Sequence, residues 1–473
     1  MAVALSSELI GQFKAIVGDA YALTDQADIA PYLTEQRDLY HGRSMLVLRP
    51  SGTEQVAAIL KLASETGTVI VPQGGNTGLV GAQQPDESGK AVVLSLGRMN
   101  KIRALDPVGN LITVEAGVIL QNVQEAADKE DRLFPLSLGS EGSCQIGGNL
   151  SSNAGGTAVL SYGNMRELCL GLEVVLPTGE ILNDLRYVKK DNSGYNLKDL
   201  FIGAEGTLGV ITAAVLKLFP KPKGKAVAYA GLKSPAAALQ LFKIATEKAG
   251  PALTGFELMP RIGVEFTVKH VEGARDPLQA PHDWYVLIDI SSNRSEEDAQ
   301  SLMEDILSVS FEADIVQDAA LAATIAQAQS FWKMREEMSW AQKPEGGSIK
   351  HDISVPVASI PAFIEEASRT VMEMVPNARI VCFGHIGDGN LHFNISQPIG
   401  AEKQAFLNLW AAVNHEVHAI VDKYHGSISA EHGIGQLKRA ELLHYKSPIA
   451  LDLMRRIKRE LDPSGIMNPG KIL

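Results

Sequence analysis

The sequence has few cysteines, and none are closely spaced. Only Cys144, Cys169 and Cys382 occur among 473 residues, which cannot form the disulfide framework of a small secreted domain and indicates a reducing compartment. No apolar run approaches the roughly 18 residues of a membrane-spanning helix. No basic run precedes an apolar block near the N-terminus, as it would in a secretory signal. We therefore expect a cytoplasmic protein without a spanning helix.

Positive charge is also scarce. Lys and Arg number 43 against 55 Asp and Glu, a formal net charge of −12. This balance argues against a nucleic-acid or anionic-membrane partner. Hydrophobic residues make up 45% and charged residues 21%, which is typical of a soluble globular chain and excludes a largely disordered one. At roughly 150 residues per domain, the length suggests two or three domains.

The common nucleotide-binding loops are missing. We find neither G-x-G-x-x-G after a first strand nor G-x-x-x-x-G-K-[ST], so a dinucleotide fold of the usual kind and a P-loop NTPase are both disfavoured. Two other glycine-rich segments stand at 72–78 and 135–164. The longer one is either a flexible linker or ligand-wrapping backbone, and its recurring apolar residues favour the second. Backbone N–H groups exposed by glycines can bind a diphosphate.

Hydrophobic periodicity indicates an α+β chain. An N-terminal amphipathic helix, a strand at 45–48, a capping box of Ser51 and Glu54 and a helix stop at Gly67 are expected. After a Pro/Lys/Gly boundary at 220–224, strands and helices alternate. We expect strands at 226–232 and 284–290, and helices at 236–248, 296–308, 319–328, 402–424 and 448–461.

Four motifs resemble the flavin-binding signature of the vanillyl-alcohol-oxidase-type (PCMH-type) flavoproteins: PQGGNTGLVG (72–81), GSEGSCQIGGNLSSNAGG (139–156), GAEGTLGVIT (203–212) and NPGK (468–471). Two others, FGHIGDGNLHFNIS and SAEHGIG, resemble its D-2-hydroxyacid dehydrogenase branch, which includes D-lactate, glycolate and D-2-hydroxyglutarate dehydrogenases. The resemblance implies a PCMH-type FAD-binding fold of two α+β subdomains, an α+β substrate (cap) domain and a small C-terminal helical segment. The corresponding ranges are 1–221, 222–425 and 426–473, the last returning to the flavin.

By this resemblance, FAD contacts residues within or next to the four motifs. Asn76 stands in the loop where covalently flavinylated members carry a histidine, so non-covalent FAD is expected, although a linkage to Cys144 stays open. The expected FAD-binding residues are Pro72, Gly74, Gly75, Asn76, Thr77, Gly78, Leu79, Leu138, Gly139, Ser143, Gly147, Gly148, Asn149, Ser152, Asn153, Gly155, Gly163, Glu205, Gly206, Gly209, Val210, Ile211 and Asn468.

Histidines concentrate in the C-terminal part of the chain. On one continuous strand, His385 and His392 would point to opposite faces, but the turn sequence at 387–390 predicts a hairpin that brings both rings together. With Glu431 they form a His2Glu set with open positions, as in catalytic zinc sites, although manganese or iron would also accept these ligands. The segment NHEVH at 414–418 lacks the i, i+4 spacing of a zincin helix.

The resemblance also assigns substrate-binding residues. Arg335 would hold the carboxylate beside the reacting carbon, and Ser339 and Lys350 would hold a distal carboxylate, with serine in place of an expected threonine. Asn394 lies two residues after His392, on the same strand face, and is expected to orient substrate or a ligand. His432 is the candidate base.

These assignments favour oxidation of D-2-hydroxyglutarate to 2-oxoglutarate by hydride transfer to flavin N5. D-lactate or glycolate is the alternative within the class, and a non-redox flavin-binding or alkyl-transferring relative is more remote. A quinone, an electron-transfer flavoprotein or another carrier is expected as electron acceptor, and a homodimer is the commonest assembly.

Overall fold

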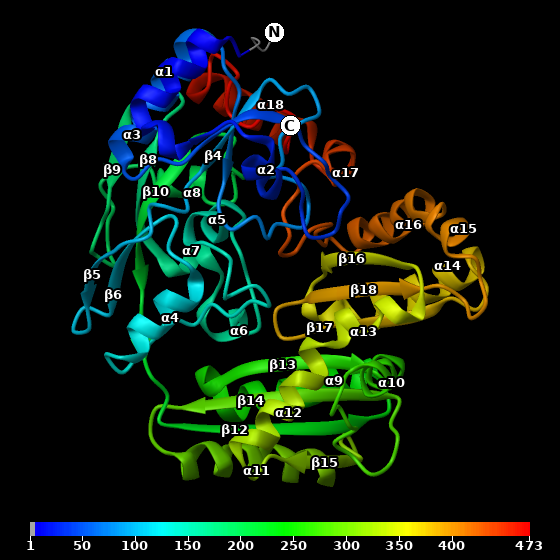
Figure 1. Cartoon of the computed structure of the whole chain (residues 1–473). Helices are drawn as coiled ribbons and strands as arrows, with labels where there is room; N and C mark the ends of the chain where they lie inside the picture. Colours follow the sequence, from blue (N-terminus) through cyan, green and yellow to red (C-terminus); the bar gives the residue numbers. More distant parts are fainter. Residues whose placement is uncertain (1–4) are drawn as a thin grey trace. The chain divides into compact units, whose positions relative to one another are not determined.

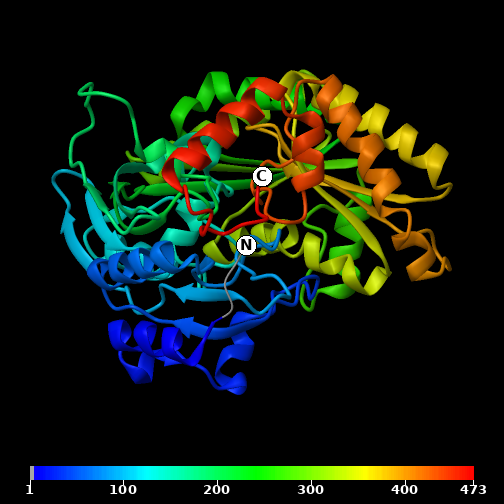
Figure 2. The ribbon, with the colours of Figure 1, turned by 90° about the horizontal axis from the view of Figure 1, so that it is seen from above.

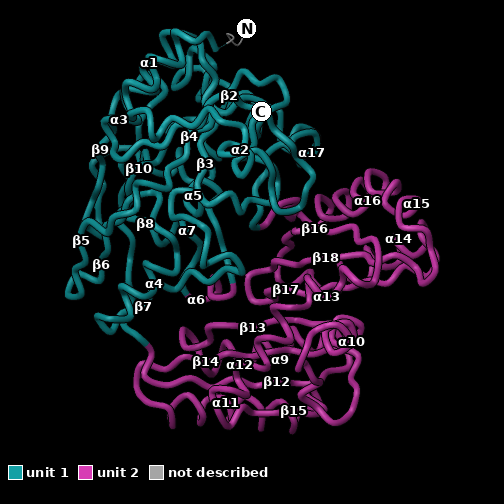
Figure 3. Tube along the Cα trace, viewed as in Figure 1, with its two compact units in different colours: residues 1–156, 162–221, 431–473 teal, residues 157–161, 222–430 magenta. Residues whose placement is uncertain are grey.

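The computed structural model describes residues 5–473, which divide into two compact units (Figure 3). Unit 1 comprises the described residues up to Gly156 together with Tyr162–Lys221 and Glu431–Leu473. Unit 2 comprises Thr157–Ser161 and Pro222–Ala430. The division into an FAD-binding range (1–221), a cap range (222–425) and a C-terminal range (426–473) stays a prediction.

Unit 1 contains a four-stranded sheet in the order β1 (Ala22–Leu23), β2 (Ser44–Leu48), β4 (Ala91–Ser95), β3 (Ile70–Gln73). Strands β2, β4 and β3 are parallel and are almost entirely buried, as expected when helices cover such a sheet. Helices α1 (Ser7–Val17) and α3 (Thr53–Thr66) supply buried residues to the same core, and α2 (Gln26–Ile29) packs against β2 (Figure 1).

The ends of α3 test two sequence predictions. Gly67 ends the helix with a left-handed φ of 68°, as expected. The predicted capping box is wrong, because Gly52 is the N-cap and makes no side-chain capping bond. The backbone N–H of Ser51 instead donates to Gln55 Oε1 at 2.7 Å. Gln55, one position after Glu54, thus accepts the hydrogen bond of the N–H group that precedes the helix.

The second sheet of unit 1 is antiparallel, in the order β5 (Ile102–Asp106), β6 (Leu111–Glu115), β10 (Val210–Lys217), β8 (Cys169–Val175), β9 (Ile181–Asp184). Its core includes residues of α4 (Leu120–Asp128), α5 (Ile146–Ser151) and α7 (Met165–Leu168). Segment 135–164 therefore is not a linker, because Leu136, Cys144 and Leu150 are buried in this core.

Unit 2 is built on a seven-stranded sheet in which every neighbouring pair is antiparallel (Figures 1 and 2). The order is β15 (Asp318–Leu321), β12 (Gly224–Leu232), β14 (Trp284–Ser292), β13 (Leu253–Pro260), β17 (Arg379–His385), β18 (Asn390–Ser396), β16 (Ser348–Ser354). The helices of this unit are α9 (Pro235–Ala249), α10 (Arg261–His270), α11 (Glu296–Glu312), α12 (Ile325–Glu336), α13 (Met338–Ala341), α14 (Ile360–Met374), α15 (Lys403–Leu407) and α16 (Trp410–Lys423), with short α6 (Val159–Tyr162) spanning the boundary with unit 1.

Two helix predictions in unit 2 need correction. The alanine-rich segment 319–328 begins as strand β15, because pairing with β12 at the sheet edge overrides the helix propensity of alanine. The helix expected at 402–424 is two helices, α15 and α16. Most other predicted elements have the expected type.

The C-terminal segment of unit 1 contains α17 (Arg439–Tyr445) and α18 (Pro448–Leu461), the second at the predicted bounds. It then adds to the first sheet, since the N–H of Ile70 donates to Ile466 O and the N–H of Asn468 donates to Ile70 O, both at 2.9 Å. These bonds place the tail beside β3, directly before the first glycine-rich loop. In the described part of the chain, no helix has the length and apolar character needed to cross a membrane.

Candidate active site

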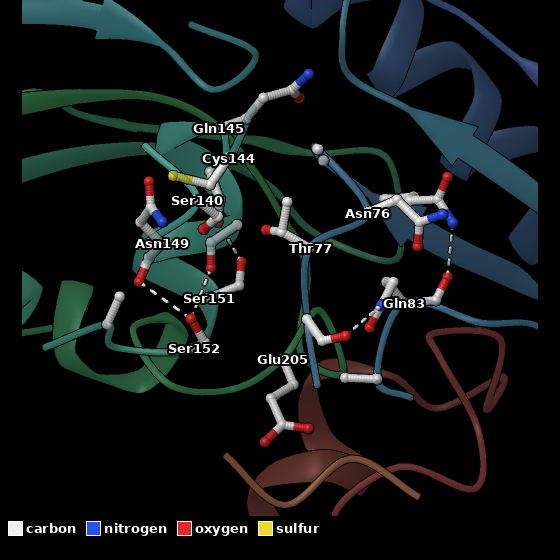
Figure 4. Close-up of a pocket in the computed structure, with 18 of the residues that line it drawn as sticks. Asn76, Thr77, Gln83, Ser140, Cys144, Gln145, Asn149, Ser151, Ser152 and Glu205 are labelled. Atoms are coloured by element: carbon white, nitrogen blue, oxygen red, sulfur yellow. Dashed lines mark hydrogen bonds between the residues drawn. The ribbon is translucent and has the colours of Figure 1, made fainter. Parts of the chain in front are cut away.

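Unit 1 encloses a cavity of about 500 Å³ between the glycine-rich segments. Figure 4 shows Asn149, Ser151 and Ser152 on one side and Thr77 and Gln83 across from them. Predicted FAD-binding residues that line it are Pro72, Gly74, Gly75, Asn76, Thr77, Gly78, Leu79, Leu138, Gly139, Ser143, Gly147, Gly148, Asn149, Ser152, Gly155, Glu205, Gly206, Gly209, Val210 and Ile211.

Glycine is required in the cavity wall for two different reasons. A Cβ on Gly75 would lie 2.1 Å from the carbonyl oxygen of Ser143, so only glycine allows the two loops to meet this closely. A Cβ on Gly139 or Gly148 would meet no atom within 4 Å. At these two positions the bare backbone faces open space, which lets a ligand approach the main chain.

Two residues that line the cavity each carry a buried acceptor oxygen without a partner among the described residues. The side-chain oxygens of Gln145 and Asn149 are buried and have no hydrogen-bond partner within residues 5–473. Such atoms cost free energy unless a ligand or water donates to them, and FAD carries N–H and O–H donors. The residues therefore fit an FAD.

Three predicted FAD-binding residues do not line the cavity. Asn153 Oδ1 accepts from the N–H of Arg166 at 2.9 Å, and Gly163 adopts φ 77° beside Glu167. Asn468 donates to the carbonyl oxygens of Ala82 and Glu205 at 2.9 and 2.8 Å. Their contacts hold the chain around the cavity.

The amide of Asn76 is also occupied, donating to Pro31 O at 3.1 Å and Thr34 O at 2.8 Å. Several further residues that line the cavity were not predicted from the motifs, although some stand inside or just after them. These are Gln36, Gln73, Val80, Ala82, Gln83, Leu96, Ala116, Ser140, Gln145, Ser151 and Ala154.

Cys144, the residue considered for a covalent link to FAD, also lines the cavity. Burial raises the pKa of the Cys144 thiol, which disfavours the thiolate that a covalent linkage would need.

Glu431 and His432 line the same cavity, and Glu205 positions their loop. The two carboxylate oxygens of Glu205 accept from the N–H groups of Ile434 and Gly435 at 2.6 and 2.7 Å. Burial raises the pKa of Glu205 to about 7, although these two donors oppose the shift. One buried side chain thus ties the C-terminal segment to the wall of the cavity.

In unit 2, the predicted histidine hairpin is confirmed. Strands β17 and β18 pair antiparallel on either side of the turn, with Phe383 opposite His392. The rings of His385 and His392 have centroids 6.1 Å apart. The turn at 387–390 therefore reverses the chain and brings together two imidazoles seven positions apart in the sequence.

Strand register places the other polar candidates of unit 2 on the same face of the sheet. Residues directly opposite each other in an antiparallel pair point to one face, as do alternate residues of a strand. Glu257 is opposite His385, and on β18 His392 is opposite Asp352 and Asn394 is opposite Lys350. This face of β13, β17, β18 and β16 therefore carries two imidazoles, two carboxylates, an amide and an ammonium group.

Arg335 reaches this face from α12. Its Nε donates to Glu257 Oε2 at 2.6 Å, and its guanidinium carbon lies 4.8 Å from the centroid of the Phe383 ring. His385 Nδ1 lies 2.5 Å from Glu257 Oε1. Burial alone would raise the pKa of Glu257, but His385 and Arg335 lower it to about 2. Nothing in the local sequence around Glu257 predicted this role.

Ser339 and Lys350 lie together, as their predicted shared role requires. Lys350 Nζ donates to Ser339 O at 3.0 Å and to Ser339 Oγ at 3.3 Å. Ser339 comes from α13, whereas Lys350 lies on β16. The helix after Arg335 and the edge strand thus present a hydroxyl and an ammonium group together.

The zincin-like histidines lie on α16, where His415 is exposed and His418 is buried. The ring of His418 packs edge-on against His351, with centroids 5.5 Å apart. The two histidines thus differ in exposure along one helix, consistent with ordinary positions of an amphipathic helix.

Comparison with known proteins identifies the domains. Residues 45–184 match the family described as an FAD binding domain, and residues 221–472 match FAD linked oxidases, C-terminal domain. The chain is similar in fold to p-cresol methylhydroxylase, with a TM-score of 0.77, 16% identity and coverage of 98% of this chain and 96% of that one. The PCMH-type fold predicted from the motifs is confirmed.

Two curated relatives match almost the whole chain. D-2-hydroxyglutarate dehydrogenase of Arabidopsis thaliana is 37% identical, covering 99% of this chain and 82% of the relative. The enzyme of the same name from Danio rerio is 39% identical, covering 91% and 79%.

Both relatives are named as mitochondrial, so the expected cytoplasmic location is wrong. The few cysteines indicated only a reducing environment, which does not separate the cytoplasm from the interior of a mitochondrion.

The cavity, its unpartnered acceptors and the matches over nearly the full chain agree on one class. This chain is an FAD-linked oxidoreductase and belongs to the family of the D-2-hydroxyglutarate dehydrogenases.

Proposed function

We propose that this chain is an FAD- and divalent-metal-dependent dehydrogenase that oxidises D-2-hydroxyglutarate to 2-oxoglutarate. The observation that carries the choice of a dicarboxylate is the presence of two cationic groups, Arg335 and Lys350, at one face of the unit 2 sheet. Arg335 is bonded to Glu257 and Lys350 to Ser339. An enzyme of a monocarboxylate substrate has less need of the second of these cations. The names of the relatives support the same substrate.

We assign FAD to the unit 1 cavity, bound without a covalent link. The open backbone at Gly139 and Gly148 and the unpartnered oxygens of Gln145 and Asn149 support this assignment. Neither histidine nor cysteine occurs in the first loop at 72–81. When bound, FAD supplies a hydride acceptor and the metal supplies a Lewis acid.

The proposed metal ligands are His385, His392 and Glu431. Because His385 Nδ1 is engaged by Glu257, its Nε2 is the nitrogen suited to a metal. Glu431 directly follows Ala430, whose N–H donates to Asp352 O at 3.4 Å, opposite His392 in the sheet. This bond, one position before Glu431 in the chain, supports Glu431 as the third ligand of the proposed set. Zinc is the first choice for this His2Glu donor set, with manganese or iron as alternatives.

The other residues bind and orient the substrate. Arg335 would bind the carboxylate beside the reacting carbon with its planar guanidinium, and Lys350 and Ser339 would bind the distal carboxylate. Asn394, opposite Lys350 in the sheet, would orient the substrate between them. His432 would accept the proton of the 2-hydroxyl group, since imidazole titrates near neutral pH.

Turnover requires a second acceptor to reoxidise the flavin. The sequence leaves open whether this acceptor is a quinone, an electron-transfer flavoprotein or another carrier.

The homodimer expected from the sequence stays a prediction.

Anaerobic reduction of the bound flavin tests the proposed function. We expect D-2-hydroxyglutarate to remove the absorbance of the oxidised flavin quickly, and D-lactate to do so slowly or not at all. The L-isomers serve as controls. Faster reduction by D-lactate would contradict the dicarboxylate assignment while leaving a dehydrogenase. A flavin that none of these compounds reduces, with FAD and metal both bound, would instead favour a non-redox or alkyl-transferring protein.

Substitution of Lys350 should separate the two substrates. A charge-assisted hydrogen bond contributes about 1.5–3 kcal/mol, so we expect Lys350→Ala to raise KM for D-2-hydroxyglutarate by about 10–100-fold. KM for D-lactate should change by less than about twofold, because D-lactate lacks the distal carboxylate. Steady-state kinetics with both substrates give the comparison. The matched control is Lys333→Ala on the exposed side of α12, where Lys333 Nζ donates to Glu272 O. Equal losses on both substrates would refute this role of Lys350.

A further inference from the structure

Glu257 lies on the central strand β13 of unit 2 and is completely buried, with 0% of its surface exposed. Buried carboxylates are rare unless they are paired. Each oxygen of Glu257 has its own partner, His385 Nδ1 at 2.5 Å and Arg335 Nε at 2.6 Å. One side chain therefore contacts both a proposed metal ligand and the proposed carboxylate-binding arginine.

The two contacts of Glu257 use Nδ1 of His385 and Nε of Arg335. An imidazole held at Nδ1 has its Nε2 fixed in direction, and metal-binding histidines commonly use their second nitrogen in this way. Arg335 is held through Nε, and its two Nη groups make no hydrogen bond with any residue that the structure describes. Those Nη groups form the edge that would face a carboxylate.

The backbone makes this contact rigid. Glu257 is directly opposite His385 in the β13–β17 pair, so its reach to the imidazole is set by strand register. Arg335 lies on α12, whose buried residues Phe331 and Met334 share a core with Phe383 of β17. Both partners of Glu257 therefore stand on elements that pack into the core of unit 2.

We propose that Glu257 is a positioning residue that holds the metal ligand His385 and the arginine Arg335 in one fixed arrangement, so that metal affinity and substrate-carboxylate binding depend on the same side chain. This inference rests on the proposed function, because it takes His385 as a metal ligand and Arg335 as a substrate ligand. Glu257 itself touches neither metal nor substrate.

The chain contains a matched comparison within the same unit. Glu345 also contacts a histidine and an arginine, His270 Nε2 at 2.6 Å and Arg379 Nη1 at 2.5 Å, and in addition accepts from Lys269 Nζ at 2.6 Å. None of those partners is a proposed site residue. If Glu257 were only a structural ion pair, its substitution, like that of Glu345, would leave zinc affinity and KM of the folded chain unchanged.

The experiment compares Glu257→Gln and Glu345→Gln in the FAD-loaded full chain. Zinc affinity is measured by competition with a chromogenic chelator, and KM by steady-state oxidation of D-2-hydroxyglutarate. Loss of such a histidine-orienting carboxylate typically weakens metal binding by about 10–100-fold. We expect Glu257→Gln to show that loss together with at least about a tenfold rise in KM, from the displaced guanidinium. Glu345→Gln should stay within about twofold of the wild type in both measurements, as expected for a residue with no part in either site.

Flavin content and the thermal unfolding midpoint check that each variant is folded. If Glu257→Gln does not fold, Glu257→Asp keeps the charge but shortens the reach by one methylene, and we expect both losses in it at about tenfold. Wild-type zinc affinity and KM in a folded Glu257 variant, or equal losses in Glu345→Gln, would overturn the inference. A wild-type chain that binds no zinc would overturn it together with the metal site, whereas reduction of its flavin by D-2-hydroxyglutarate would show that the dehydrogenase assignment still stands.

Discussion

Replacing Arg335 with lysine should lower kcat/KM for D-2-hydroxyglutarate by at least about 100-fold. Breaking one partner of a buried, hydrogen-bonded charge pair costs about 2–5 kcal/mol, and about 1.36 kcal/mol corresponds to a factor of ten in rate. Arg335 is only 7% exposed and is bonded to Glu257 through Nε. Its guanidinium can keep that bond and still present two further nitrogens to a carboxylate.

Lysine cannot do both, because its single ammonium group must either remain with Glu257 or turn to the substrate. Steady-state kinetics with an artificial electron acceptor would measure the effect. Arg379→Lys is the matched control, since Arg379 also pairs with a glutamate, Glu345, and lies over an aromatic ring, that of Phe266. A decrease of less than about fivefold in Arg335→Lys would mean that Arg335 stabilises the fold but does not bind the reacting substrate.

Removal of the metal should abolish turnover, with a loss of about 1,000-fold or more, while FAD stays bound. A Lewis-acid metal contributes several kcal/mol to the transition state, and about 4 kcal/mol corresponds to that factor. FAD should remain because the glycine-rich loops that line its proposed cavity belong to unit 1. The two histidine ligands belong to unit 2.

The measurement is activity and flavin absorbance after treatment with a chelator and gel filtration, followed by addition of Zn²⁺, Mn²⁺ or Fe²⁺. His392→Ala should reproduce the stripped protein, whereas His415→Ala, on the exposed side of α16, should not. Full activity in protein shown to contain no metal would refute the His2Glu site. Loss of FAD together with the metal would instead show that the two sites depend on each other.

The local sequence was sufficient to predict those elements whose stabilising interactions join residues only a few positions apart. The reversal at 387–390 follows from glycine, aspartate and asparagine in a turn, and it alone brings His385 and His392 together. The helix at 448–461 follows from its 3.6-residue periodicity and an N-terminal proline. Even here local patterns had limits, because Ser51 and Glu54 matched a capping box that the helix does not use.

The resemblance to a known family predicted the FAD-binding residues, and most of them line the cavity. It did not separate residues that face the cavity from those that shape its wall. Asn153 and Asn76 use their side chains to bind neighbouring backbone. Which way a side chain points in an irregular loop depends on contacts with distant segments, and a motif does not contain that information.

Short-range turn rules were thus enough to predict the two glycine-rich loops and the histidine hairpin from the sequence. The enzyme family followed from motifs that resemble those of known flavoproteins. Two long-range contacts could be found only in the folded chain. Glu205 anchors the loop of His432, 227 positions after it, and Glu257 contacts His385 across 128 positions. These contacts depend on strand register and on the return of the C-terminal segment to β3. Both are set by how whole elements pack their apolar faces, and the local sequence around Glu205 or Glu257 carries no trace of that packing.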